Sequence, residues 1–79
     1  MPTLRKEFGH RLRTIRLERK LSQESFAEFV GISVDFLSLI ERGINAPSFE
    51  TIEQMAKRLR VPVKALFDFA DARGSRSRP

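Results

Sequence analysis

The 79-residue sequence contains no cysteine and only one histidine, His10. Without cysteine, the chain has no disulfide bonds and no thiolate ligands for a structural metal ion, so its stability must come from a hydrophobic core or a partner subunit. The lack of cysteine is compatible with a cytoplasmic location, which we expect. His10 has no ligand pattern beside it, and we expect it to lie on the surface or to pack along the first helix.

Long apolar runs are also missing. The longest apolar stretches span only a few residues, and the charged start of the chain, residues 1–6, is not followed by one. A membrane-spanning helix needs about 20 predominantly apolar residues, and a signal peptide needs an apolar central region. We therefore expect neither a membrane span nor a signal peptide.

The sequence has little of the chemistry that enzymes require. We find no paired carboxylates, no nucleophile with an adjacent base, no glycine-rich phosphate loop and no cluster of metal ligands. We therefore expect that the protein is not an enzyme and that it uses no cofactor. No small-molecule ligand is evident either.

Positive charge is abundant, and it is concentrated at the two ends of the chain. The sequence has 15 Lys or Arg residues and 10 Asp or Glu residues, for a net charge of +5. Residues 1–20 contribute +5 (seven basic against two acidic), residues 21–60 contribute −2 (four against six), and residues 61–79 contribute +2 (four against two). Nucleic acid is the natural partner of such a chain. A solvated basic surface is the alternative that charge alone leaves open.

Hydrophobic spacing predicts a single all-helical domain. The chain is 41% hydrophobic and 32% charged, which is typical of a globular protein, and its length leaves room for one compact domain. Thr3 can cap a first helix that ends near Lys20. Apolar residues at spacings of four and three form its inward face: Phe8, Leu12 and Ile15.

Serine caps and glycine turns delimit three further helices. Ser22 precedes a helix over residues 23–30, and Gly31 tolerates the left-handed backbone of a tight turn. Ser33 precedes a helix over residues 34–42 that Gly43 ends as C-cap. Ser48 caps the fourth helix, which has the clearest amphipathic pattern. The residues expected to face the core on these helices are Phe26, Ala27, Val30, Leu37, Ile40, Ile52, Met55, Ala56 and Leu59.

The C-terminal part is predicted to contain a fifth helix and a tail. Pro62 suits the first turn of a helix, and the apolar residues that follow give this helix an inward face: Val63, Leu66, Phe67 and Ala70. The domain then covers residues 1–70. Residues 71–79 are polar and basic with glycine, serine and proline, which predicts a disordered tail. Its arginines either attract phosphate nonspecifically or have no role.

Four short strings carry a resemblance to a known family. They are LSQESFA at residues 21–27, VGIS at 30–33, LSLIERG at 37–43, and PS at 47–48 followed by Thr51. Together they resemble the phage-repressor and Cro-like (XRE) family of helix-turn-helix proteins, over about residues 12–67. The resemblance implies an all-α, five-helix, lambda-repressor-like DNA-binding domain with its third helix in the major groove of double-stranded DNA.

The resemblance also implies which residues meet the bases. Carried over position by position, these are Ser33, Val34, Asp35, Ser38 and Leu39, and Phe36 is a further candidate. None is an Arg, Lys, Gln or Asn, the residues that make the common bidentate contacts with bases. Asp35 can instead accept from a cytosine amino group, and Val34 or Phe36 can touch a thymine methyl. In the alternative interpretation, Val34, Phe36 and Leu39 belong to the core or to a protein interface.

Other residues are expected to hold phosphates or to fix the structure. Gln23, Arg42 and Asn45 are candidates for phosphate contacts, which orient a protein on DNA without reading sequence. The family pattern pairs Glu41 with an arginine of the first helix, here Arg16, and we interpret this ion pair as structural.

Two hypotheses for function follow. The first is a transcriptional regulator, specifically a repressor, that binds a two-fold symmetric operator as a homodimer. The expected dimer contact is the fifth helix with Val63, Phe67 and Phe69; Phe29 and Phe69 fall outside the core stripes and are expected to be exposed. The second is a protein-interaction module, such as an antitoxin-like partner or an adaptor, that uses the apolar side chains of the third helix.

Overall fold

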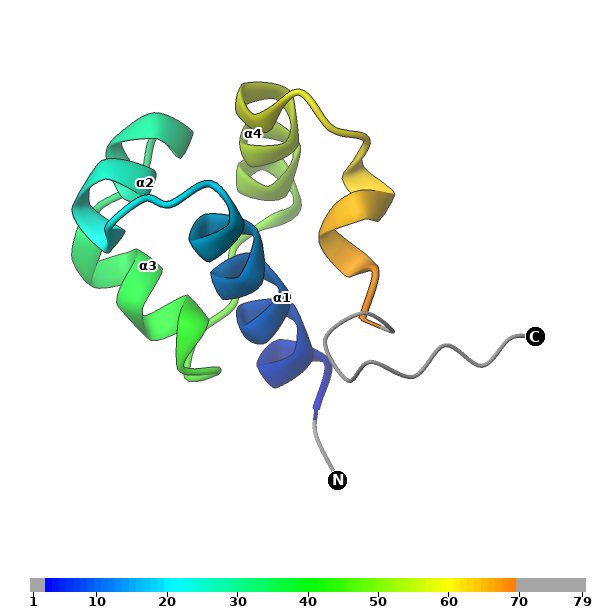
Figure 1. The fold of residues 1–79 in the computed structure, drawn as a ribbon. Coiled ribbons are helices and arrows are strands. Elements are labelled where there is room, and N and C mark those ends of the chain that lie inside the picture. Colours follow the sequence, from blue (N-terminus) through cyan, green and yellow to red (C-terminus); the bar gives the residue numbers. More distant parts are fainter. Residues whose placement is uncertain (1–2, 70–79) are drawn as a thin grey trace.

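The computed structural model describes residues 3–69, and these residues form a ring of helical elements around one core. The elements are the four α-helices α1 (Leu4–Glu18), α2 (Gln23–Val30), α3 (Val34–Glu41) and α4 (Phe49–Leu59), and the 3₁₀ helix η1 (Val63–Phe67). No strand occurs among residues 3–69. Helix α1 packs against α3 on one side and η1 on the other, α2 packs against α3 and α4, and α4 packs against η1 (Figure 1). None of the described helices is long and apolar enough to cross a membrane.

The core is the one that hydrophobic spacing predicted. Every residue expected to face inward on the first four helices is buried, and Leu66 of η1 completes the cluster. These side chains come from all five elements, so each element is held by its apolar face rather than by helix propensity alone.

Each of the four α-helices begins at a hydroxyl side chain, as predicted. Thr3, Ser22, Ser33 and Ser48 have extended backbones, and each side-chain oxygen accepts a hydrogen bond from the backbone N–H three residues later. Such a bond satisfies one of the donors that a helix start leaves without an intrahelical partner. The starts of the helices are therefore fixed by local sequence.

Two helix ends differ slightly from the prediction. Helix α1 ends at Glu18 and not near Lys20, because Lys20 takes a left-handed φ of 60° and the Leu21 N–H donates to the Arg16 carbonyl oxygen. Helix α3 ends at Glu41 with Arg42 as C-cap, and Gly43 is the next residue, with a φ of 77°. At both ends, the N–H of a residue beyond the helix donates to a carbonyl oxygen in the last turn: Leu21 to Arg16 in α1, and Ile44 to Leu39 in α3.

The predicted fifth α-helix is wrong, because this segment forms the short 3₁₀ helix η1. Pro62 is extended and precedes the first turn, and the Ala65 N–H donates to the Pro62 carbonyl oxygen in an i to i+3 bond. The shorter helix lets the chain turn after Phe67 so that the Phe69 ring packs 6.0 Å from the Phe67 ring. Phe69 is therefore partly buried against the core, although we expected it to be exposed. The predicted tail and Ala70 lie outside the described residues.

Candidate nucleic-acid interface

Helices α2 and α3 are joined by a tight turn over residues 31–33, as a helix-turn-helix requires. Gly31 has a φ of 87°, and a side chain there would collide with the amide of Gln54. This amide donates a 2.8 Å hydrogen bond to the carbonyl oxygen of Val30 at the end of α2. One turn further along α4, Arg58 Nη1 donates to the Phe29 carbonyl oxygen at 3.2 Å. Helix α4 therefore holds the turn in place by bonding the last carbonyls of α2.

Helix α3 has an inner side and an outer side. Leu37 and Ile40 point inward and are fully buried. Because a helix has about 3.6 residues per turn, the opposite side carries three residues of α3 and its C-cap. We call these four residues the outer face of α3: Asp35, Ser38, Leu39 and Arg42. Asp35 and Arg42 are exposed, and Ser38 and Leu39 are half-buried.

The structure divides the predicted base-contacting residues into two groups. Val34 and Phe36 are partly buried and pack against the core. For these two residues, this agrees with the alternative interpretation, which assigned them to the core or to a protein interface. Ser33 is exposed at the start of α3, where its Oγ accepts from the Phe36 N–H at 3.0 Å. The outer face retains Asp35, Ser38 and Leu39 of the original set.

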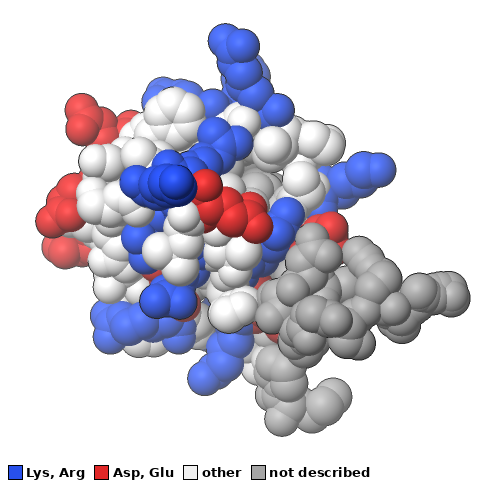
Figure 2. Space-filling model, in the orientation of Figure 1, with Lys and Arg blue, Asp and Glu red and all other residues white. Residues whose placement is uncertain are grey.

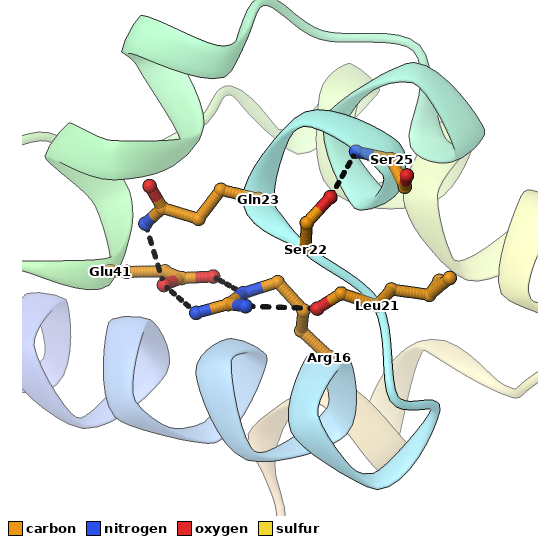
Figure 3. Close-up of polar contacts among 6 residues, drawn as sticks. All are labelled: Arg16, Leu21, Ser22, Gln23, Ser25 and Glu41. Atoms are coloured by element: carbon orange, nitrogen blue, oxygen red, sulfur yellow. Dashed lines mark hydrogen bonds and ion pairs between the residues drawn. The ribbon is translucent and has the colours of Figure 1, made fainter.

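An ion pair fixes the end of α3 to α1 (Figure 3). Arg16 Nε lies 2.7 Å from Glu41 Oε2, and Arg16 Nη2 donates to Glu41 Oε1 at 3.1 Å. The exposed fractions of the two side chains are 10% and 3%. The third guanidinium nitrogen, Nη1, donates to the carbonyl oxygen of Leu21 at 3.0 Å, just before the N-cap Ser22. One guanidinium therefore ties together α1, the end of α3 and the start of α2.

Gln23 takes part in the same network. Its Nε2 donates to Glu41 Oε1 at 3.0 Å, so Glu41 accepts three hydrogen bonds. From the sequence we predicted for Gln23 only a role in phosphate binding. In the structure Gln23 lies where the start of α2 meets the end of α3, and one of its amide hydrogens is bonded to the buried Glu41 carboxylate.

Helix α1 approaches α3 closely at Gly9. A side chain on Gly9 would overlap the carbonyl group of Ile40, which lies in the last turn of α3. Our sequence reasoning did not single out Gly9, because it sits in the helical pattern without a turn nearby. Its role depends on contact with a helix 31 residues away, which no local pattern reveals.

The start of α1 lies against the turn that follows α3. Arg5 Nη1 donates to the carbonyl oxygen of Ile44 at 3.4 Å, and a Cβ on Gly43 would lie 2.6 Å from Lys6 Cγ. Arg42 and Asn45 of this turn are exposed, as are Arg5 and Lys6 of α1. We call Arg5, Lys6 and Arg42 the basic corner; the sequence suggested only Arg42.

The helix pair itself is acidic. Residues 23–41 contain four acidic residues and no basic ones, and only Glu41 is neutralised by an ion pair there. Figure 2 shows acidic side chains at the upper left, where α2 lies, and basic side chains at the lower left, near the end of α3. Positive charge is therefore supplied by residues that flank the pair.

A second surface feature is an apolar groove between α4 and η1. The groove has a volume of about 300 Å³ and is lined by Phe49, Ile52, Glu53, Val63 and Phe67. Two of the three predicted dimer-contact residues line it, and Val63 is 42% exposed. Phe49, which we did not predict, is 82% exposed at the first position of α4. Phe29 is 44% exposed, as expected, but it does not line this groove.

Comparison with known proteins gives relatives that are named as repressors, regulators or control proteins. The chain is 36% identical over 59 residues to a transcriptional repressor of the cryptic phage CTXphi from Vibrio cholerae, covering 75% of this chain and 53% of the repressor. It is 40% identical over 63 residues to the control protein C.BamHI from Bacillus amyloliquefaciens, covering 78% of each chain. The chain thus spans about half the length of the Vibrio repressor. These names are those of regulators rather than of enzymes, in agreement with the sequence-based expectation.

Solved structures and family models agree with these relatives. The restriction-modification controller protein C.AhdI from Aeromonas hydrophila has the same fold, with a TM-score of 0.73 and 34% identity over 78% of this chain and 94% of that one. The helix-turn-helix model HTH_3 matches residues 12–66, which include α2, α3 and α4 in full. The resemblance seen in the sequence is therefore confirmed, and the chain belongs to the HTH_3 (XRE) helix-turn-helix family.

Proposed function

We propose that this protein is a transcriptional regulator, specifically a repressor, that binds double-stranded DNA in a sequence-specific manner. The observation that carries the proposal is the outer face of α3, which projects from a firmly fixed helix beside the basic corner. A helix of this kind fits the major groove, and cations at its end can hold the adjacent phosphates. Repressors and control proteins among the relatives support this assignment. Because its ligand would be DNA, we also propose a cytoplasmic location.

The phosphate contacts are assigned to two groups of residues. Arg42, Lys6 and Asn45 lie at or beside the end of α3, and the start of α2 presents backbone N–H groups next to Gln23. The N-terminus of a helix attracts anions through its free N–H groups and its dipole. Gln23 then orients a phosphate with its second amide hydrogen while the first remains on Glu41.

Selection from a random library of DNA duplexes tests this function. The protein should enrich a two-fold symmetric sequence, and its affinity should fall steeply as the salt concentration rises, because bound phosphates release their counterions. Binding to a fluorescently labelled duplex is measured by fluorescence anisotropy between about 50 and 200 mM salt. These measurements give the slope of log affinity against log salt concentration. A protein that enriches no sequence, or whose affinity does not respond to salt, does not have this function.

We further propose that the protein binds its operator as a homodimer through the groove between α4 and η1. An 82% exposed phenylalanine beside an apolar groove is costly in a monomer, and burial against a second copy removes this area from water. The predicted contacts Val63 and Phe67 line the groove, and Phe69 lies against Phe67. Two half-sites about 34 Å apart would then be read by the two α3 helices.

Sedimentation equilibrium tests the dimer. Phe49→Ser should raise the dimer dissociation constant by at least tenfold, since truncation of an aromatic hot-spot residue at an interface costs about 2 kcal/mol or more. Phe29→Ser is the matched control, because Phe29 is exposed elsewhere on the surface and should leave the dissociation constant unchanged. An equal effect of the two substitutions would contradict this location of the interface.

The alternative of a protein-interaction module has less support. It relied on an apolar surface formed by three residues of α3, but Val34 and Phe36 pack against the core. Only Leu39 of the three remains on the outer face, and one leucine is a small area for protein binding.

A further inference from the structure

We propose that Leu39 reads the 5-methyl group of a thymine in each half-site, and that this contact contributes more to sequence recognition than any hydrogen bond from the first two turns of α3. The inference rests on the proposed function, since it requires α3 to lie in the major groove. It names the chemical feature of DNA that the helix recognises.

The position of Leu39 carries the first step. Helix α3 has five apolar residues, and four of them contact the core: Leu37 and Ile40 are fully buried, and Val34 and Phe36 pack against the cluster. Leu39 is the apolar residue of α3 that does not belong to the core. It lies on the outer face beside Ser38, between the exposed side chains of Asp35 and Arg42.

The chemistry of the outer face carries the second step. Guanine presents two acceptors in the major groove, and recognising them takes a donor such as Arg or Lys. Asp35 offers only acceptors when ionised, and Leu39 offers no polar group. An acceptor of guanine placed against Leu39 would lose its water without gaining a partner. Thymine, in contrast, presents a methyl group that a leucine side chain can cover.

Neighbouring residues define the base pairs around this thymine. Asp35 can accept a hydrogen bond from the amino group of cytosine or adenine, and Ser38 can donate to or accept from either kind of base edge. Arg42 is the first residue on this face that can make a bidentate contact with guanine or pair its charge with a phosphate. We therefore expect guanine to be rare where the first two turns of α3 lie and allowed near the end of the helix.

Replacing thymine by deoxyuridine tests the proposal directly, because deoxyuridine keeps every hydrogen-bonding group of thymine and lacks only the methyl. The probe is the duplex enriched from the random library, synthesised with one thymine at a time replaced. One thymine position in each half-site should lose about fourfold in affinity, the equivalent of about 0.8 kcal/mol for one buried methyl group. Replacement in both half-sites should lose about sixteenfold.

A variant of the protein identifies the side chain that senses the methyl. Leu39→Ala should bind the thymine duplex more weakly than the original protein, and it should no longer distinguish thymine from deoxyuridine at that position. This double-mutant cycle isolates the coupling between side chain and methyl group. The matched control is Leu17→Ala on α1, another leucine with an exposed side chain, which should keep the full sensitivity. Thermal unfolding checks that Leu39→Ala is folded. The deoxyuridine measurements with the original protein do not depend on this variant.

The outcomes separate this inference from the proposed function. If the protein enriches a site that contains no thymine, or if no deoxyuridine changes the affinity, Leu39 does not read a methyl group although the protein is a DNA-binding regulator. Equal sensitivity of Leu39→Ala and the original protein would assign the effect to another residue and overturn the inference. Failure to enrich any sequence contradicts the proposed function itself.

Discussion

The inner and outer sides of α3 are built for different purposes. On the inner side, Leu37 and Ile40 are fully buried, and Glu41 is held by a bidentate ion pair. The outer side carries one acid, one hydroxyl, one leucine and one arginine, and two of these four side chains are exposed. The residues that position the helix are therefore different from those that we propose to recognise DNA. Changes on the inner side should alter stability, and changes on the outer side should alter DNA binding at constant stability.

The largest loss of stability is expected from Arg16→Ala. This substitution leaves the Glu41 carboxylate buried without its cation, and a buried charge that loses its partner typically costs about 3–5 kcal/mol. Urea unfolding followed by circular dichroism measures the change. Arg13→Ala is the control, because Arg13 is exposed on the same helix and should change the free energy of unfolding by less than about 0.5 kcal/mol.

A double substitution sharpens the same point. Arg16→Met combined with Glu41→Leu removes both charges, and replacement of a whole buried pair by apolar residues is often neutral or stabilising. The double variant should therefore be more stable than Arg16→Ala. If it is equally unstable, the bonds to Leu21 and Gln23 contribute more than the desolvation of an unpaired charge, and our account of the junction is wrong.

Gly9→Ala is expected to have the second largest effect. In an exposed helix this change would stabilise by about 1 kcal/mol. Here the new methyl group would overlap the Ile40 carbonyl, so α1 and α3 must move apart, and such overpacking typically costs about 1–3 kcal/mol. Urea unfolding should show a net loss of stability. The exposed neighbour serves as control, since His10→Ala should be nearly neutral; a stabilised Gly9→Ala would mean that the helices are not in close contact.

The features of this fold that could be predicted from the sequence are those set by residues close together in the chain. The helix starts were predictable because a serine and the N–H three residues later are neighbours in the chain. The core was predictable because its residues recur with the period of a helix. The overlap at Gly9 and the second role of Gln23 arise from contacts between helices that are distant in sequence. The fifth α-helix was predicted wrongly because a favourable local pattern does not reveal the ring contacts of Phe67 with Phe8 of α1 and with Phe69 that accompany the shorter η1.

On the outer side, Arg42→Gln should change binding without changing stability. One lost phosphate contact per protomer is two per dimer, which lowers the slope of log affinity against log salt by about 1.8, and it should weaken binding to all sequences to a similar extent. Anisotropy titrations over a range of salt concentrations measure this slope. Lys57→Gln is the matched control: it removes one positive charge from the exposed side of α4, away from α3. An equal response to both would indicate that net charge, rather than a contact at Arg42, determines binding.

The smallest effect is expected from Lys6→Gln, and it tests whether the basic corner acts as a unit. Lys6 reaches the end of α3 only because α1 is packed against Gly43, so its contribution to DNA binding depends on the inner side of the molecule. In the original protein, Lys6→Gln should lower the salt slope by less than the value of about 1.8 expected when a full phosphate contact is lost from each protomer of the dimer. In the Gly9→Ala background, where α1 is displaced from α3, the same substitution should have a still smaller effect. An undiminished effect in that background would mean that Lys6 attracts DNA by charge alone and that the two sides of α3 are independent.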